Sequence, residues 1–84
     1  MMKEIRKKTW SEYFEKVAAG EKNFELRKDE DGVEVGDVLI LEEWIPDNNG
    51  SGYYTGRKAR RIARYIIRDA PEWGLMSGYC IIGF

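Results

Sequence analysis

Hydrophobic positions near the start of the chain recur at helical spacing. The positions concerned are Trp10, Phe14, Val17 and Ala18, which share one face of a helix with 3.6 residues per turn. Thr9 and Glu12 have the spacing of a capping box, in which both side chains bond to free amides at the helix start. Gly20 follows the last apolar turn, where a left-handed residue ends many helices. The pattern predicts a helix over residues 10–19, packed through Trp10 and Phe14.

The remaining apolar residues alternate with polar ones or form short runs, and both patterns predict strands. The expected strands cover residues 3–8, 23–28, 38–45, 57–69 and 78–84. The apolar run 38–41 indicates burial on both faces, and the turn-rich segment 46–52 predicts a hairpin loop. Residues 57–69 also fit an amphipathic helix, but the β-branched and aromatic end 65–67 favours a strand.

The second expected strand carries charges inside an alternating pattern. Phe24 and Leu26 alternate with Glu25 and Arg27, so on a pleated strand the apolar pair shares one face and the charged pair the other. We expect the apolar pair to enter the core. Lys22 precedes the strand, and we expect it in the turn, leaning over the opening that Glu25 and Arg27 line.

Composition indicates one globular domain. The 84 residues are 43% hydrophobic and 13% aromatic, which suffices for a compact core and exceeds what disordered chains contain. Cys80 is the single cysteine and histidine is absent, which excludes an internal disulfide, histidine-dependent catalysis and the usual zinc sites. We expect a buried Cys80, no metal and no cofactor. No apolar run approaches the roughly 20 residues of a membrane helix, so we expect a cytoplasmic protein that does not enter a membrane.

A formal net charge of −1 hides a separation of charge along the chain. Basic residues without an intervening acid run from Arg57 to Arg68, a second basic segment covers residues 3–8, and residues 12–47 between them are strongly acidic. Such a distribution allows a basic stripe on an acidic protein. A stripe of this kind suits modest contact with phosphate groups.

The segment from Gly20 to Arg27 has the pattern Gly-x-Lys-x-x-Glu-x-Arg, which resembles the signature of the ASCH domain, a branch of the PUA-like superfamily of small β-barrels associated with RNA. Three further segments support the resemblance: 35–39, 54–57 and 78–82. Together they cover nearly the whole chain and look most like small stand-alone ASCH-like proteins of bacteria and phages. The resemblance implies an α+β fold, a PUA-like twisted, mostly antiparallel β-barrel of five to six strands with one major helix.

The resemblance also implies that the chain binds RNA or a nucleotide-like ligand. We expect the site in a cleft between the turn at Gly20 and the hairpin from Trp44 to Tyr54. Lys22 and Arg27 would meet phosphate or carbonyl oxygens, and Glu25 would read hydrogen-bond donors. The other expected ligand-binding residues are Trp44, Tyr54, Arg57, Arg60 and Arg64. We expect a monomer.

Three alternatives stay open at this point. Lys22, Glu25 and Arg27 would form only a structural ion-pair network in the first. In the second the chain is a hydrolase with Lys22 and Glu25 as catalytic candidates, either a ribonuclease or an amidohydrolase acting on acylated nucleosides. Some ASCH relatives use a threonine nucleophile three residues after the motif lysine, and the matching position here is Glu25, so that nucleophile is missing. The third alternative is an adaptor that binds a protein partner through Trp44, Tyr53 and Trp73.

Overall fold

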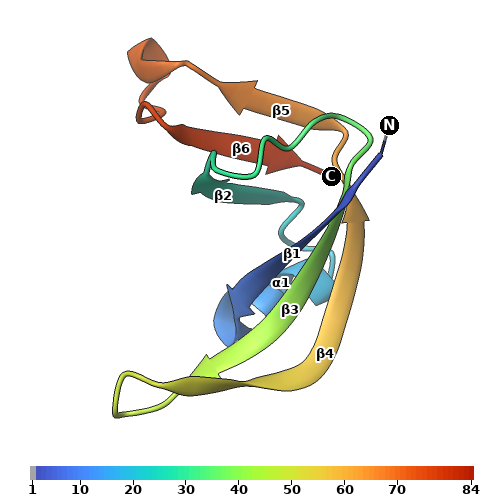
Figure 1. The fold of residues 1–84 in the computed structure, drawn as a ribbon, viewed down its shortest axis with the longest axis vertical. Helices are drawn as coiled ribbons and strands as arrows, with labels where there is room; N and C mark the ends of the chain where they lie inside the picture. The colour runs from blue at the N-terminus through green and yellow to red at the C-terminus, as the bar shows by residue number, and fades with distance from the viewer. Residues whose placement is uncertain (1) are drawn as a thin grey trace.

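The computed structural model describes residues 2–84, which form six strands, one α-helix and one short 3₁₀-helix (Figure 1). In chain order the elements are β1 (Glu4–Trp10), α1 (Ser11–Ala18), β2 (Phe24–Lys28), β3 (Val38–Pro46), β4 (Gly52–Ile62), β5 (Tyr65–Arg68), η1 (Pro71–Trp73) and β6 (Tyr79–Gly83). The α+β class and the number of strands expected from the sequence are confirmed.

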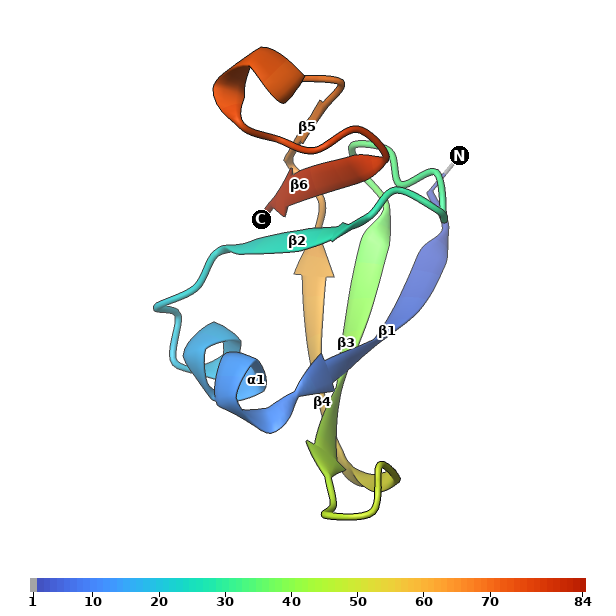
Figure 2. The same cartoon turned by 90° about the vertical axis from the view of Figure 1, so that its left-hand side faces the viewer.

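The six strands form two three-stranded sheets, with the orders β1-β3-β4 and β2-β6-β5. β1 runs parallel to β3, and the other three pairings are antiparallel. Within residues 2–84 no strand pairing joins the two sheets, so the strands do not close into the expected barrel. The helix and its following turn carry the chain from β1 to β2, which leaves both strands at the edge of their sheets (Figure 2).

The core lies between the inner face of the β1-β3-β4 sheet, the helix and the second sheet. Its members are Ile5, Phe14, Val17, Val33, Leu39, Leu41, Ala59, Ala63, Cys80 and Ile82. Residues 38–41 of β3 are all buried, which confirms the prediction from the continuous apolar run. Cys80 is buried, as predicted.

The helix matches its predicted span to within one residue at each end, but its start differs from the prediction. Trp10 is the N-cap residue and no side chain caps the helix, so the predicted capping box is wrong. Thr9 belongs to β1, where its hydroxyl donates to the Lys7 carbonyl (3.3 Å) and accepts from Arg27 (3.1 Å). Trp10 is 49% exposed, so Phe14 and Val17 alone anchor the helix in the core.

The segment 57–69 is extended, as predicted, but it forms parts of two strands. The break falls at Ala63 and Arg64, between β4 and β5. The Ala63 N–H donates to the Asp37 carbonyl at 2.8 Å, beside the start of β3, whereas the Arg64 N–H donates to the Gly83 carbonyl of β6 at 2.8 Å. The chain therefore passes from one sheet to the other at this point, where the strand is interrupted.

Two buried or half-buried carboxylates fix the corners of the fold. Asp37 accepts the backbone N–H groups of Glu34 (2.8 Å) and Lys3 (3.0 Å), and these bonds, the first above all, lower the pKa of the Asp37 carboxyl. Asp29 forms a two-point ion pair with Arg68 (2.6 and 3.0 Å), which lowers the pKa of Asp29 in the same way. Both contacts stabilise the ionised carboxylates.

Candidate functional site

The turn between α1 and β2 begins at Gly20, which has the expected left-handed backbone with φ of 77°. The Gly20 N–H donates to the Val17 carbonyl at 3.0 Å, which closes the last turn of the helix. The chain then doubles back toward β2. Lys22 lies in this turn, as predicted, and its ammonium donates to the Phe24 carbonyl at 2.7 Å.

The orientation of β2 is the reverse of the predicted one. Glu25 points inward and is 3% exposed, whereas Phe24 and Leu26 point outward and are 48% and 57% exposed. The two pairs do occupy opposite faces, as the alternation requires. The inward face is the charged one because two cations reach Glu25 there and neutralise it, which removes most of the cost of burying a carboxylate.

Lys22, Glu25 and Arg27 form one compact ion-pair network. Lys22 Nζ donates to Oε1 of Glu25 at 2.5 Å, and Arg27 Nε donates to Oε2 at 2.9 Å. Both carboxylate oxygens are thereby occupied by side chains of the same chain. Glu25 is accordingly a positioning residue that holds the two cations. Its predicted role in reading hydrogen-bond donors of a ligand stays a prediction.

The same two cations bond to the open edges of the two sheets. The Phe84 N–H donates to the Asn23 carbonyl at 2.9 Å, so the backbone N–H and C=O groups of odd-numbered residues along β2 point toward β6. The backbone groups of Phe24 point the other way, and its carbonyl is directed at Lys22 on the open edge of the sheet. Arg27 Nη2 donates to the Lys8 carbonyl of β1 at 3.0 Å. Lys22 and Arg27 therefore protect exposed strand edges, a common use of basic side chains.

A cleft of about 860 Å³ lies between the edges of β1 and β2 and reaches the helix. Five basic and two acidic residues line it: Arg6, Lys7, Lys8, Lys22, Arg27, Glu25 and Glu30. Its other lining residues are Thr9, Trp10, Tyr13, Phe24 and Leu26. The motif residues thus line a large open cleft although they also pair with one another.

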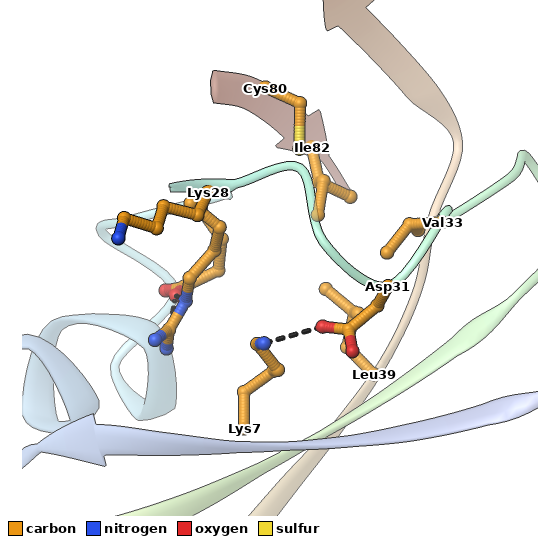
Figure 3. Close-up of a pocket in the computed structure, with 9 residues that line it drawn as sticks. Lys7, Lys28, Asp31, Val33, Leu39, Cys80 and Ile82 are labelled. Carbon is orange, nitrogen blue, oxygen red and sulfur yellow. Dashed lines mark hydrogen bonds and ion pairs between the residues drawn. The ribbon is translucent and has the colours of Figure 1, made fainter. Parts of the chain in front are cut away.

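A much smaller void, of about 10 Å³, adjoins this cleft beneath the loop that follows β2. Figure 3 shows Lys7 reaching up from β1 toward Asp31 in that loop, with Cys80, Ile82 and Leu39 around the void. The Lys7 ammonium donates to Asp31 at 2.5 Å. The void is about the size of a single water molecule, so it is no ligand site.

The other predicted ligand-binding residues lie outside the cleft. Trp44 and Tyr54 face each other across β3 and β4. Arg57 pairs with Glu15 of the helix (2.5 Å), Arg60 pairs with Glu4 (2.9 Å), and Arg64 is exposed where the chain crosses between sheets. The structure therefore brings Lys22, Glu25 and Arg27 together and separates them from this second group. Gly20 lies in the preceding turn and does not line the cleft.

Sequence reasoning singled out three of the twelve residues that line the cleft, namely Lys22, Glu25 and Arg27. Lys8, Thr9, Trp10 and Tyr13 are among those it missed. Their position depends on β1 lying at a sheet edge opposite β2, which no local pattern reports. A partial signal exists, because Arg6, Lys8 and Trp10 are spaced two apart and share one side of a strand.

Glu43 is a third buried carboxylate, beside Glu25 and Asp37, and the sequence did not single it out. It accepts the hydroxyl groups of Thr55 (2.6 Å) and Ser11 (2.7 Å), and these bonds, that from Thr55 most of all, lower the pKa of Glu43, with a smaller effect of the nearby Arg57. The contacts join the start of the helix to β3 and β4. We assign Glu43 a structural role because its oxygens are engaged on both sides.

Two features, a metal-binding cluster and a membrane-spanning helix, are absent from residues 2–84. No group of three or more cysteine or acidic side chains is arranged to hold a metal ion there. No helix in that range has the length and apolarity needed to cross a membrane.

Comparison with known proteins relates the chain to one family. The model of a domain of unknown function, DUF3850, matches residues 6–84. An uncharacterized 12.9 kDa protein in the GpA 3′ region of Escherichia phage P2 is 39% identical over 75 residues. That alignment covers 87% of this chain and 62% of the phage protein, so the chain spans less than two thirds of that relative's length. Because the family model covers nearly the entire sequence, the chain belongs to the DUF3850 family.

Proposed function

We propose that the chain binds RNA or a nucleotide-like ligand in the cleft between β1 and β2, as a PUA-like module of the ASCH type. The proposal keeps the motif residues Lys22 and Arg27 as ligand-binding groups. It takes the protein to be a cytoplasmic monomer. The phage relative and the family description carry no function of their own, so the support comes from the residues of the cleft.

The observation that carries the proposal is the charge and shape of the cleft. Five basic residues line it against two acidic ones, on a chain whose net charge is −1. The side chains of Trp10, Tyr13 and Phe24 add exposed aromatic surface to the same lining. A basic groove combined with aromatic rings is what unpaired nucleotides require, because phosphates need cations and bases need stacking surfaces.

The two motif cations retain donors for a ligand after their internal bonds are counted. A guanidinium has five N–H groups and an ammonium three. Arg27 uses Nε and Nη2 for Glu25, Lys8 and Thr9, which leaves Nη1. Lys22 donates to Phe24 and Glu25, which leaves one N–H. These donors suit phosphate or carbonyl oxygens, and Glu25 fixes their direction.

Binding is favoured over hydrolysis by the state of Glu25. A general base needs a carboxylate oxygen within reach of the attacking water. Both oxygens of Glu25 accept bonds from Lys22 and Arg27 instead, and the position carries glutamate where a threonine nucleophile is expected in hydrolytic ASCH relatives. The hydrolase alternative therefore gains no support from the geometry.

Titration with a short RNA at low salt tests the proposal. We expect the backbone amide signals of residues 20–27 to shift on binding. Lys22→Gln keeps a donor but removes the charge, and we expect it to weaken binding about tenfold, because hydrogen bonds to charged groups contribute about 1.5–3 kcal/mol. The matched control is Lys16→Gln, at an exposed lysine of α1 outside the cleft lining. Unmoved signals of residues 20–27 at saturating RNA would refute the proposal.

A further inference from the structure

We infer that the ligand is a single-stranded oligonucleotide, which leaves the cleft over Trp10 and continues across the outer face of the β1-β3-β4 sheet. This inference rests on the proposed function and names the class of ligand. It places Trp44, Tyr54 and Arg60, which lie outside the cleft, on the path of the same ligand.

The strand register assembles a row of three aromatic side chains on that face. Trp10 of β1 stands opposite Trp44 of β3, and Trp44 stands opposite Tyr54 of β4. The rings of Trp10 and Trp44 are 6.1 Å apart and inclined by 40°. Trp10 is half exposed, Trp44 is partly buried between its neighbours, and Tyr54 is 55% exposed.

An irregularity in β4 is what brings Tyr54 into the row. Glu42 pairs with Lys58 but Trp44 pairs with Tyr54, so two residue steps along β3 correspond to four along β4. With a regular register, Gly56 would stand opposite Trp44. The bulged residues include Gly56 with φ of 93°, a backbone that favours glycine. The bulge thereby places an aromatic ring where a glycine would have been.

Basic residues flank the aromatic row on the same face. The next row contains Lys8 and Lys58 on either side of Glu42, and the one after it contains Arg6 and Arg60 on either side of Ile40. Lys8 Nζ lies 4.3 Å from the centre of the Trp44 ring. Glu42 lies 3.5 Å from Arg6 and 3.8 Å from Lys58. Such exposed ion pairs are weak, so phosphate groups can replace the carboxylate as partner.

Trp10 connects this face to the cleft, because it lines the cleft and also forms one end of the aromatic row. Neighbouring strands lie about 4.8 Å apart, so the row from β1 to β4 extends roughly 10 Å beyond the cleft edge. A mononucleotide in the cleft is too short to reach the aromatic row, whereas successive unpaired bases of an oligonucleotide reach it. Bases of a duplex are paired and stacked internally, so the row selects single strands.

The experiment compares a mononucleotide with a single-stranded RNA of eight nucleotides as ligands of the full chain. We expect Tyr54→Ala to weaken binding of the eight-nucleotide RNA about 5- to 150-fold, since stacking contributes about 1–3 kcal/mol per base, and to leave mononucleotide binding unchanged. Tyr53→Ala is the matched control. Tyr53 is similarly exposed but points to the opposite side of β4, so neither ligand should be affected.

The possible results distinguish the binding cleft from the path over the sheet. If Lys22→Gln weakens RNA binding and Tyr54→Ala does not, the path over the sheet is wrong and the cleft stands. If neither ligand binds the wild-type chain, the proposed function is wrong as well. Equal binding of duplex and single-stranded RNA contradicts the inference. So does a dimer in sedimentation that dissociates on Tyr54→Ala, because the face would then be a protein interface.

Discussion

Glu25 shows how one buried acid organises a basic site. Alone, a carboxylate that is 3% exposed would pay a large desolvation cost. Its bonds to Lys22 and Arg27 compensate this cost and also restrict two long side chains that otherwise sample many rotamers. The cations are thereby held in position at the cleft before any ligand arrives, which lowers the entropy lost on binding.

Replacement of Glu25 tests this role directly. In Glu25→Gln the charge is lost while the size and one acceptor oxygen remain. We expect the free energy of unfolding to fall by about 1–3 kcal/mol, because Lys22 and Arg27 lose a charged partner in a largely buried setting. Urea unfolding measures this change.

The control for that substitution is Glu21→Gln, four residues earlier in the chain. Glu21 forms an exposed ion pair with Lys16 at 3.3 Å, and exposed pairs contribute little. We expect a change within about 0.5 kcal/mol. Equal effects of the two substitutions would show that Glu25 does not organise the site.

At the scale of elements, close packing constrains the β3–β4 hairpin. Gly52 lies beside the ring of Trp44, and a Cβ atom at this position would overlap the ring and the Ile45 carbonyl. The backbone of Gly52 has no left-handed φ, so the requirement for glycine is steric. The Trp44 ring can therefore occupy its place in the aromatic row only because residue 52 has no Cβ atom.

Gly52→Ala tests this constraint. We expect it to reduce the free energy of unfolding by about 1–3 kcal/mol, the usual cost of overpacking. Gly83→Ala serves as comparison, because a Cβ there meets its nearest atom, the Tyr65 carbonyl oxygen, at an ordinary 3.5 Å. Alanine should be neutral or slightly stabilising at Gly83. If Gly52→Ala unfolds at the same urea concentration as the wild type, the Trp44 ring is not constrained as described.

The elements themselves were largely predictable, whereas their arrangement was not. Hydrophobic periodicity and turn residues predicted the positions of α1, β2, β3 and β6, because these signals are local. Alternation showed that Glu25 and Leu26 occupy opposite faces, but it does not report which face is inside. That choice depends on Lys22 and Arg27 reaching Glu25 in space. The division into two sheets likewise depends on the crossing at Ala63 and Arg64, for which the sequence carries no signal that we recognised.

The distribution of charge over the folded molecule differs from the one that the linear sequence suggests. The basic run from Arg57 to Arg68 suggested a basic stripe, but acids from distant segments neutralise much of it. Arg57 pairs with Glu15, Arg60 with Glu4, and Arg68 with Asp29. The cleft between the sheets keeps an excess of positive charge, because five basic residues line it against two acids. The excess is small, since Arg6 and Lys7 also pair with Glu42 and Asp31 outside the lining.

This location of the charge predicts how RNA binding responds to salt. When a protein neutralises phosphates of a single strand, the logarithm of the binding constant falls with the logarithm of salt concentration, with a slope of about −0.7 per phosphate contact. If Lys22 contacts a phosphate, Lys22→Gln should reduce the magnitude of the slope by about 0.7, measured by fluorescence anisotropy between low and physiological salt. Lys16→Gln, at a lysine outside the cleft, should leave the slope unchanged. Equal losses for both lysines would mean that the RNA responds to net charge alone, and an unchanged slope for Lys22→Gln would assign its ammonium to a base or sugar oxygen.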